Sequence, residues 1–368
     1  MIKILHMSTA LDGGGVEKFL LNYYKHINRK KIHFSIIVPG FKKGLLEDDF
    51  LQLGANVYHV HKLSDNLFKG IIDIYKVVKN NEYDVVHCHG NKSSLLGIIF
   101  GFFCGIKVRI VHAHMTEETI VHFKKIYKKI SSLIIDLFCT DRFACGEDAG
   151  IYLFGKRKFT IINNAIELEN FKFDIDYRDK KRRNFSNNDI ILCCVARFNE
   201  QKNHKFLINV FYELTKLSTD YKLILLGDGP LMSSIKEKCK ELGIIDKVFF
   251  LGNRNDVNKI MSIADIGILT SLYEGLPVVL VEMQAAGLPV LCSDSVTKEV
   301  NITKKIKYID LKYGSKYWSK EILSIELNSG NSREMIYNSM IGSKYDIISQ
   351  AKQLENIYYE KLIGKNEA

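Results

Sequence analysis

Two glutamates around a Gly-Leu-Pro turn are the residues of this chain whose spacing best suits chemistry. In Ser271–Val290, Glu274 and Glu282 follow the pattern Glu-x7-Glu, and the turn occupies 275–277. The preceding run ADIGILTS has the composition of a buried strand, and proline is tolerated in the first turn of a helix. We therefore expect a strand that ends at Glu274, then a helix that Gly275 and Pro277 open and that carries Glu282 about two turns along.

This order of elements suits a ligand that contains both phosphate and sugar. The first turn of a helix presents unpaired N–H groups and the positive end of the helix dipole, which favour a phosphate. A carboxylate beside it can accept hydrogen bonds from sugar hydroxyls. The motif thus indicates a nucleotide-sugar site, and the alternative is an ordinary helix start with two solvated glutamates.

A pair of cations forms a second candidate site, in VARFNEQKNHKFLI. Arg197 ends an expected strand, and Lys202 follows five residues later. A forked guanidinium and a compact ammonium at this spacing can converge on a diphosphate. Such charge would also stabilise a departing nucleoside diphosphate. The alternative is two exposed cations at a strand end.

Three glycine-containing turns follow other expected strands: LDGGGVE at 11–17, LLGDGP at 225–230, and FLGNRNDV at 250–257. Glycines lack Cβ atoms, so backbone N–H groups there can approach phosphates closely. None matches the dinucleotide fingerprint or a P-loop. For LDGGGVE, the alternative is a tight turn that binds no ligand.

Two His-x-His pairs end neighbouring strands. His87 and His89 form one pair, and His112 and His114 form the other. Residues i and i+2 of a strand share a face, so each pair could chelate zinc. Because no Asp or Cys at zinc-typical spacing completes a site, no metal is expected. The remaining alternative for each is a buried histidine with satisfied hydrogen bonds.

Strands and helices alternate along the whole chain, which predicts parallel sheets. The charged stretch 171–189 interrupts the alternation and is the best linker candidate. We therefore expect an α/β protein of two Rossmann-like, doubly wound domains facing across a cleft. The expected division is 1–175, 176–342 and a C-terminal helix in 343–368 that returns to the first domain.

The composition fits a globular protein without a membrane span. The 368 residues are 46% hydrophobic and 26% charged, with a net charge of +10. The apolar run 95–105 is too short for a bilayer and is expected to be a buried helix. Eight scattered cysteines indicate a reducing compartment. The chain begins as a strand, so no signal peptide is expected.

Taken together, these segments resemble retaining glycosyltransferases of family 4, which have the GT-B fold. RFACGEDAGIYLFG and TIINNAIELENFKF are similar to the bacterial exopolysaccharide and capsule subgroup. Three places depart from the pattern: Ala196 replaces a glycine, Ala165 replaces the glycine of Asn-Gly-Ile-Asp, and 293–303 lacks a Gly-Gly-x-x-Glu loop.

The resemblance implies a role for each motif. Arg197 and Lys202 would hold the diphosphate, Glu274 the sugar hydroxyls, and Glu282 the ribose. His114, with His112 as second choice, would help to position the reacting centre. The other implied residues are His89 on the acceptor side and, on the donor side, Gly14, Gly15, Gly227, Asp228, Gly252, Arg254, Asp256, Val257, Gly275, Leu276 and Pro277.

The implied reaction moves a hexose or N-acetylhexosamine from a UDP-sugar to a polyprenyl-diphosphate-linked oligosaccharide, without metal or cofactor. The segment 121–133 carries Lys124, Lys125, Lys128 and Lys129 on one helical face beside aromatic residues. Such a helix can dock on anionic lipid, and the alternative is a solvated face. A cytoplasmic enzyme, peripheral on the inner face of the cell membrane and without a nucleic-acid partner, is therefore expected.

Two other functions remain open at this point. One is a UDP-sugar epimerase of related fold, which needs no acceptor. The other is a partner subunit that kept the fold but lost catalysis. The basic helix argues against the first, and the intact Arg197, Lys202, Glu274 and Glu282 argue against the second.

Overall fold

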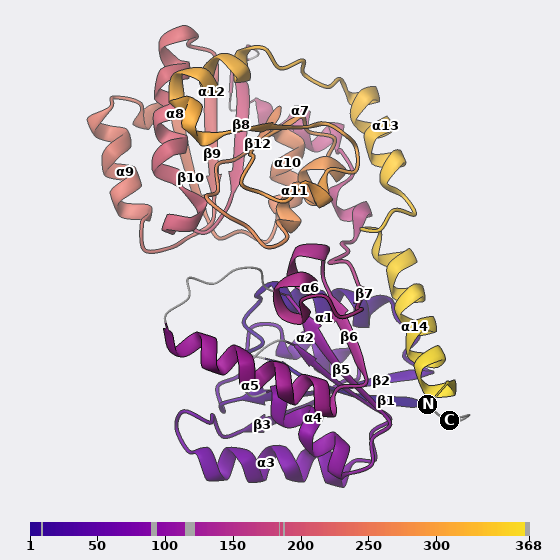
Figure 1. The fold of residues 1–368 in the computed structure, drawn as a ribbon. Helices are drawn as coiled ribbons and strands as arrows, with labels where there is room; N and C mark the ends of the chain where they lie inside the picture. The colour runs from indigo at the N-terminus through magenta and orange to yellow at the C-terminus, as the bar shows by residue number, and fades with distance from the viewer. Residues whose placement is uncertain (9, 90–93, 115–121, 184, 187, 365–368) are drawn as a thin grey trace. The chain divides into compact units, whose positions relative to one another are not determined.

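The protein consists of two α/β units, seen in a computed structural model that describes residues 1–8, 10–89, 94–114, 122–183, 185–186 and 188–364 (Figure 1). The first unit comprises Met1–Ala165 and Lys344–Ala368, and the second comprises Ile166–Ser343. The first boundary thus lies before the expected one at 175. The second lies one residue after the expected one.

The first unit is built on a fully parallel seven-stranded sheet in the order β3-β2-β1-β4-β5-β6-β7. Its strands are β1 (Ile2–Met7), β2 (Ile32–Pro39), β3 (Asn56–Val60), β4 (Val85–His89), β5 (Val108–Ala113), β6 (Asp141–Ala144) and β7 (Thr160–Ile161). The order reverses between β1 and β4, which makes this unit doubly wound.

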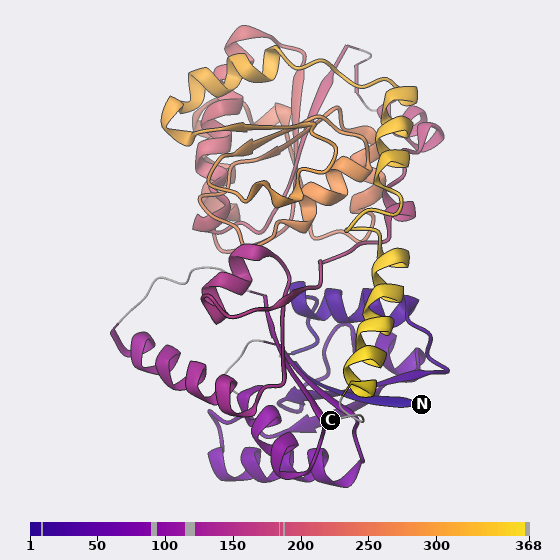
Figure 2. The same ribbon diagram turned by 45° about the vertical axis from the view of Figure 1, so that its right-hand side comes forward.

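Seven helices accompany this sheet in the part of the unit that the structure describes: α1 (Gly15–His26), α2 (Glu47–Gln52), α3 (Leu67–Asn80), α4 (Ser94–Phe103), α5 (His122–Phe138), α6 (Glu147–Phe154) and α14 (Ile347–Ile363). The last helix, α14, packs against α1 (Figure 2). It buries Ala351, Leu354 and Tyr358 in the core of this unit. Lys361 near its end forms an ion pair with Asp141 at 2.7 Å.

The second unit is built on a parallel six-stranded sheet in the order β10-β9-β8-β11-β12-β13. Its strands are β8 (Ile190–Val195), β9 (Tyr221–Leu226), β10 (Val248–Gly252), β11 (Ile266–Leu269), β12 (Val290–Ser293) and β13 (Ile306–Ile309). Its α-helices are α7 (Ile175–Arg182), α8 (His204–Leu217), α9 (Met232–Glu241), α10 (Val257–Ile263), α11 (Val278–Ala285), α12 (Gly314–Leu323) and α13 (Gly330–Met340). The strand order reverses between β8 and β11.

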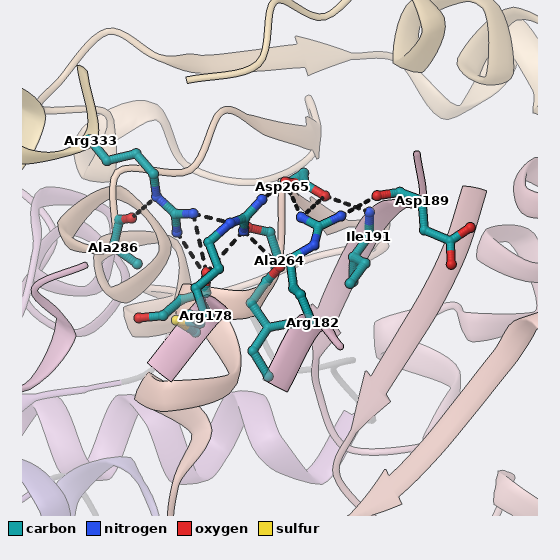
Figure 3. Close-up of polar contacts among 11 residues, drawn as sticks. Arg178, Arg182, Asp189, Ile191, Ala264, Asp265, Ala286 and Arg333 are labelled. Atoms are coloured by element: carbon teal, nitrogen blue, oxygen red, sulfur yellow. Dashed lines mark hydrogen bonds and ion pairs between the residues drawn. The ribbon is translucent and has the colours of Figure 1, made fainter. Parts of the chain in front are cut away.

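The stretch predicted to be a linker is instead part of the second unit. Helix α7 occupies its middle, and Asp174 caps the helix by accepting a hydrogen bond from the Tyr177 amide at 2.9 Å. Arg178 and Arg182 of α7 both form ion pairs with Asp265 before β11 (Figure 3). Two of the charges that made the stretch look solvated are therefore engaged in tertiary contacts.

A buried arginine on α13 completes this polar network. Arg333 is only 3% exposed and donates hydrogen bonds to the carbonyl oxygens of Ala286, Ala264 and Met261 at 2.8–3.0 Å (Figure 3). Helix carbonyls without an intrahelical partner need such donors. Burial lowers the pKa of Arg333 to about 9. The network joins α7, α10, α11 and α13 at one side of the sheet.

The apolar run at 95–105 forms α4, but the prediction that it is buried was wrong at its end. Leu95 and Ile98 are buried, whereas Phe102 and Phe103 are exposed. None of the helices among the described residues has the length and apolar composition needed to cross a membrane.

Candidate active site

The carboxyl ends of β8 and β11 bring two of the expected site residues together. These strands are neighbours, but the chain continues from β8 to β9 on one side and from β11 to β12 on the other. Open α/β sheets bind ligands at such a reversal of strand order, beyond the carboxyl ends of the strands. Lys202 follows β8 and Glu274 follows β11.

Lys202 and Glu274 form an ion pair with each other. The Nζ of Lys202 contacts Oε1 of Glu274, and the two side chains are 19% and 7% exposed. The Ser271 hydroxyl donates a hydrogen bond to the same Oε1 at 2.6 Å, and the Gln201 amide donates one to Oε2 at 3.4 Å. The carboxylate of Glu274 is thus held by charge-assisted hydrogen bonds from two loops.

The backbone of these two loops is also joined. The side chain of Asn199 accepts a hydrogen bond from the Lys202 amide at 3.1 Å and caps the short 3-10 helix Glu200–Lys202. The Thr270 hydroxyl donates to the Lys202 carbonyl at 3.3 Å, and the Leu272 amide donates to the Gln201 carbonyl at 2.8 Å. The position of Lys202 relative to Glu274 is therefore fixed by main chain as well as by charge.

Arg197 differs from Lys202 in its surroundings. It follows β8, its side chain is exposed, and that side chain forms no hydrogen bond or ion pair with any residue that the structure describes. The amide of its neighbour Ala196 bonds to the Leu226 carbonyl at 2.9 Å, so the backbone at this point still belongs to the sheet edge. The guanidinium is available to bind an anion.

Helix α11 carries Glu282 as expected, but it begins later than predicted. Pro277 is its N-cap, so the first helical residue is Val278. Gly275 and Leu276 are half-buried in the turn before it, and Glu282 is half-buried on the helix. The start of α11 therefore lies close in sequence after Glu274.

The backbone of the turn after β9 lies in close contact with the backbone that follows β8. At Gly227 the backbone φ is +125°, and a Cβ would lie 2.2 Å from the Ala196 carbonyl oxygen. Only glycine fits there without a backbone shift. Asp228 beside it accepts a hydrogen bond from the Phe198 amide through its carbonyl at 2.9 Å. Gly227 and Asp228 thus shape the edge next to Arg197.

The residues expected to hold the nucleobase follow β10. The Gly252 carbonyl accepts a hydrogen bond from the Gly227 amide at 2.9 Å, and α10 begins at Val257. Arg254 forms a two-pronged ion pair with Asp256, with both contacts at 2.7 Å. The guanidinium lowers the pKa of the Asp256 carboxyl. These two side chains therefore bind each other at the surface.

In the first unit, Gly14 and Gly15 begin α1 directly after β1. Gly14 is the N-cap and Gly15 the first helical residue. A Cβ on Gly14 would lie 2.4 Å from Oε2 of Glu17, so the buried Glu17 side chain folds over the helix start. The two glycines stand at the β1–β4 reversal of strand order.

Five histidines gather at the carboxyl ends of β1, β4 and β5, at the same edge of the first sheet. They form two hydrogen-bonded rows. His89 contacts His6 at 3.1 Å and His114 at 2.9 Å. His87 contacts His112 at 3.2 Å and the Tyr358 hydroxyl of α14 at 2.8 Å.

Burial keeps these imidazoles neutral. His6, His87, His89 and His112 are at most 3% exposed, and desolvation lowers the pKa of each well below the usual value. Desolvation also lowers the pKa of His114 to about 3. Two sets of three, His6–His87–His89 and His89–His112–His114, place one ring nitrogen of each member within 4.8 Å of the others.

A pocket of about 360 Å³ opens beside this edge, at the carboxyl ends of β1, β2 and β3. Its walls are mostly apolar and include Met7, Pro39, Val60 and Ile74, and Lys62 lies at its rim. The pocket therefore offers an apolar surface next to a cation.

The basic helix predicted at 121–133 corresponds to the first part of α5, which begins at His122. The side chains of Lys124, Lys125 and Lys128 lie outside the described residues, and Lys129 is exposed. Farther along, α5 exposes Leu133 and Leu137, and it packs against α4, whose Phe102 and Phe103 are exposed.

Sequence reasoning missed several residues of these sites. Ser271 and Gln201 hold Glu274, but small polar residues near a motif carry no distinct signal. His6 joins the histidine cluster from β1, and Tyr358 joins it from the far end of the chain. Only the parallel order of the strands could have placed His6 there.

Comparisons with known proteins match both units. Residues 13–169 match the family model described as Glycosyltransferase Family 4, and residues 176–340 match Glycosyl transferases group 1. EpsF of Bacillus subtilis is 29% identical over 97% of this chain and 96% of its own. The Escherichia coli UDP-Gal:alpha-D-GlcNAc-diphosphoundecaprenol alpha-1,3-galactosyltransferase is 25% identical over 99% of this chain and 98% of its own.

The fold is shared with solved structures. The crystal structure of Anabaena Alr3699/HepE in complex with UDP matches with a TM-score of 0.81 at 18% identity, over 98% of this chain and 100% of that one. The expected GT-B architecture is thereby confirmed. The two family models together match 13–169 and 176–340, and the chain belongs to the family 4 glycosyltransferases of GT-B fold.

Proposed function

We propose that this glycosyltransferase moves a hexose or N-acetylhexosamine from a UDP-sugar to a lipid-linked oligosaccharide, with retention of the anomeric configuration. The main support for a donor site in the second unit is the Lys202–Glu274 ion pair at the β8–β11 edge. The Escherichia coli relative is named for UDP-galactose, and HepE was crystallised with UDP. Both names support a uridine nucleotide here.

The donor replaces the ion pair between Lys202 and Glu274 with a new partner for each residue. The diphosphate binds Arg197 and draws Lys202 away from Glu274, and the N–H groups at the start of α11 add donors. Glu274 stays fixed by Ser271 and Gln201 and accepts hydrogen bonds from sugar hydroxyls. Glu282 binds the ribose, and backbone at 252–257 holds the base.

The transfer breaks the bond between C1 of the sugar and the β-phosphate oxygen. The acceptor hydroxyl forms the new bond on the same face, and its proton passes to the departing phosphate oxygen. Arg197 and Lys202 stabilise the negative charge that develops on the diphosphate. His114 helps to position the reacting centre, and no metal or cofactor enters the reaction.

The acceptor is a polyprenyl-diphosphate-linked sugar of capsule or exopolysaccharide synthesis. The Escherichia coli relative is named for a diphosphoundecaprenol acceptor. In this chain the first unit offers His89 and the apolar pocket with Lys62 at its rim. The enzyme works in the cytoplasm, on the inner face of the membrane.

The exposed side chains of α4 and α5 make the contact with the membrane. Phe102, Phe103, Leu133 and Leu137 are 48–71% exposed, and Lys129 lies on the same helix as the two leucines. Apolar side chains beside cations suit the interface of an anionic bilayer. These four apolar side chains and Lys129 form the α4–α5 surface.

The test is binding and turnover across a panel of UDP-, GDP- and ADP-sugars in the presence of EDTA. Saturable binding of one UDP-sugar, and NMR of the product showing the anomeric configuration of the donor, are expected. The Arg197→Ala, Lys202→Ala double variant serves as the control and should not bind. If no nucleotide sugar binds the wild type, the transferase proposal fails and a non-catalytic partner subunit becomes the better interpretation.

A further inference from the structure

The histidine cluster of the first unit contains a set of nitrogens that the transfer reaction does not explain. We propose that His89, His112 and His114 bind one divalent transition-metal ion of the class that includes zinc, cobalt and nickel. The proposal does not depend on the donor or the acceptor. An ion held there would occupy a nitrogen of His114 and so block the positioning role proposed for that residue.

The pairing of β4 with β5 brings these three imidazole rings close to one another. His89 and His112 are register partners in the β4–β5 ladder, and His114 lies two residues beyond His112. One nitrogen of each residue lies within 4.8 Å of the other two, and Nδ1 of His89 is 2.9 Å from Nε2 of His114. Zinc binds histidine nitrogens at about 2.0–2.1 Å, so ligand nitrogens lie roughly 3.3 Å apart. Small side-chain movements would reach this geometry.

The outer nitrogens of two ligands already have partners. His89 Nε2 contacts His6 Nδ1 at 3.1 Å, and His112 Nδ1 contacts His87 Nε2 at 3.2 Å. His87 in turn contacts the Tyr358 hydroxyl. Metal-binding histidines commonly donate their second N–H in this way, which fixes the tautomer. Protons on the outer nitrogens leave the lone pairs of His89 Nδ1 and His112 Nε2 for an ion.

A buried nitrogen of His112 that lacks a hydrogen-bond partner also supports the proposal. His112 Nε2 is buried and has no hydrogen-bond partner among the described residues. A buried polar atom without a partner costs free energy, and an ion would satisfy it. His114 is only half-buried, which gives an ion a route that the deeper set of His6, His87 and His89 lacks. Neutral imidazole, the form that burial favours here, is the form that binds metal.

The experiment is a cobalt titration of the full chain after treatment with EDTA and removal of the chelator. Wild-type protein should bind one equivalent of Co²⁺ and develop visible d–d absorption without a thiolate charge-transfer band. The His112→Phe and His114→Ala variants should both lose this absorption. The control is His61→Ala, because His61 is a more exposed histidine of the same unit, paired with Asp73 at 2.6 Å.

Circular dichroism establishes whether each variant is folded. If His112→Phe does not fold, the test rests on His114→Ala. Absorption lost in the folded cluster variant and kept in His61→Ala supports the site. The proposal is overturned if wild-type protein gives no such absorption, if the absorption survives in His114→Ala, or if it carries the charge-transfer band of a cysteine ligand.

Discussion

Lys202 and Glu274, to which the proposed reaction assigns different parts of the donor, form an ion pair with each other at the β8–β11 edge. The pair is largely buried, and Glu274 keeps two further hydrogen-bond donors, Ser271 and Gln201. A diphosphate can therefore take Lys202 without leaving the carboxylate unpartnered. The exchange would couple phosphate binding to the release of a sugar-binding carboxylate.

The first prediction is that Lys202→Ala and Glu274→Gln are not additive. Each single change should lower kcat/KM about 10- to 150-fold, because each removes charge-assisted hydrogen bonds of about 1.5–3 kcal/mol. The double variant should lose less than the product of the two. Steady-state kinetics of the four proteins measure this coupling. Strictly multiplicative losses would show that the pair acts as two independent residues.

The second prediction concerns Arg197, which is exposed and bonded to no described side chain. Arg197→Ala should weaken UDP binding by about tenfold or more, because a charged hydrogen-bond donor to the diphosphate is lost. The free energy of unfolding should change by less than about 0.5 kcal/mol. Calorimetric titration and urea unfolding measure the two effects. Lys240→Ala, which removes a surface ion pair with Glu237, is the control and should alter neither.

The sequence predicted the sheets and the edge where the candidate site lies, because most of the strands contain an apolar run that a turn follows. Arg197, Lys202 and Glu274 were placed after strands, and parallel strands bring such residues to one edge. The direct contact between Lys202 and Glu274 was not predicted. It depends on the lengths of two loops and on Ser271, which no spacing rule identifies.

The linker prediction failed for a related reason. A charged stretch is usually solvated, but Arg178 and Arg182 find Asp265 more than 80 residues away in the chain. The histidine cluster was half predicted. The pairs at 87–89 and 112–114 are visible in the sequence, whereas His6 and Tyr358 come from other elements. Tertiary partners, and not local composition, decide these cases.

The third prediction tests the buried network around Arg333 (Figure 3). Arg333→Met should destabilise the protein by about 3 kcal/mol or more, since several buried carbonyls lose a charged donor. Arg254→Met is the matched control from the same unit. Its ion pair with Asp256 is exposed and worth about 1 kcal/mol at most. Urea unfolding of both variants gives the comparison, and equal losses would contradict a special role for Arg333.

The fourth prediction is a pH dependence caused by His204. Its ring stacks on Phe198 at 4.0 Å, and both ring nitrogens are buried without a hydrogen-bond partner among the described residues. Burial lowers its pKa to about 4. Between pH 6.5 and 4 the unfolded chain binds a proton that the folded chain does not. Stability therefore falls as the pH falls through this window, by about 1.4 kcal/mol per pH unit.

His204→Phe keeps the stacked ring and removes the titration. Urea unfolding at pH 7 and pH 5 should show a smaller loss of stability for this variant than for the wild type. At pH 7 its stability should match or exceed that of the wild type, because no hydrogen bond is lost. An unchanged difference between the two pH values would mean that His204 titrates normally in the folded protein.

The fifth prediction concerns the α4–α5 surface, where Phe103 and Leu137 are 71% and 63% exposed. Wild-type protein should bind vesicles that contain phosphatidylglycerol more tightly than vesicles of phosphatidylcholine. Phe103→Ser and Leu137→Ser should each weaken this binding about tenfold or more, because burying such a side chain contributes about 1.5–3 kcal/mol. Leu45→Ser is the control, since Leu45 is 81% exposed elsewhere in the first unit. Co-sedimentation measures all four proteins, and an equal effect of the control would leave the α4–α5 surface without a role in membrane contact.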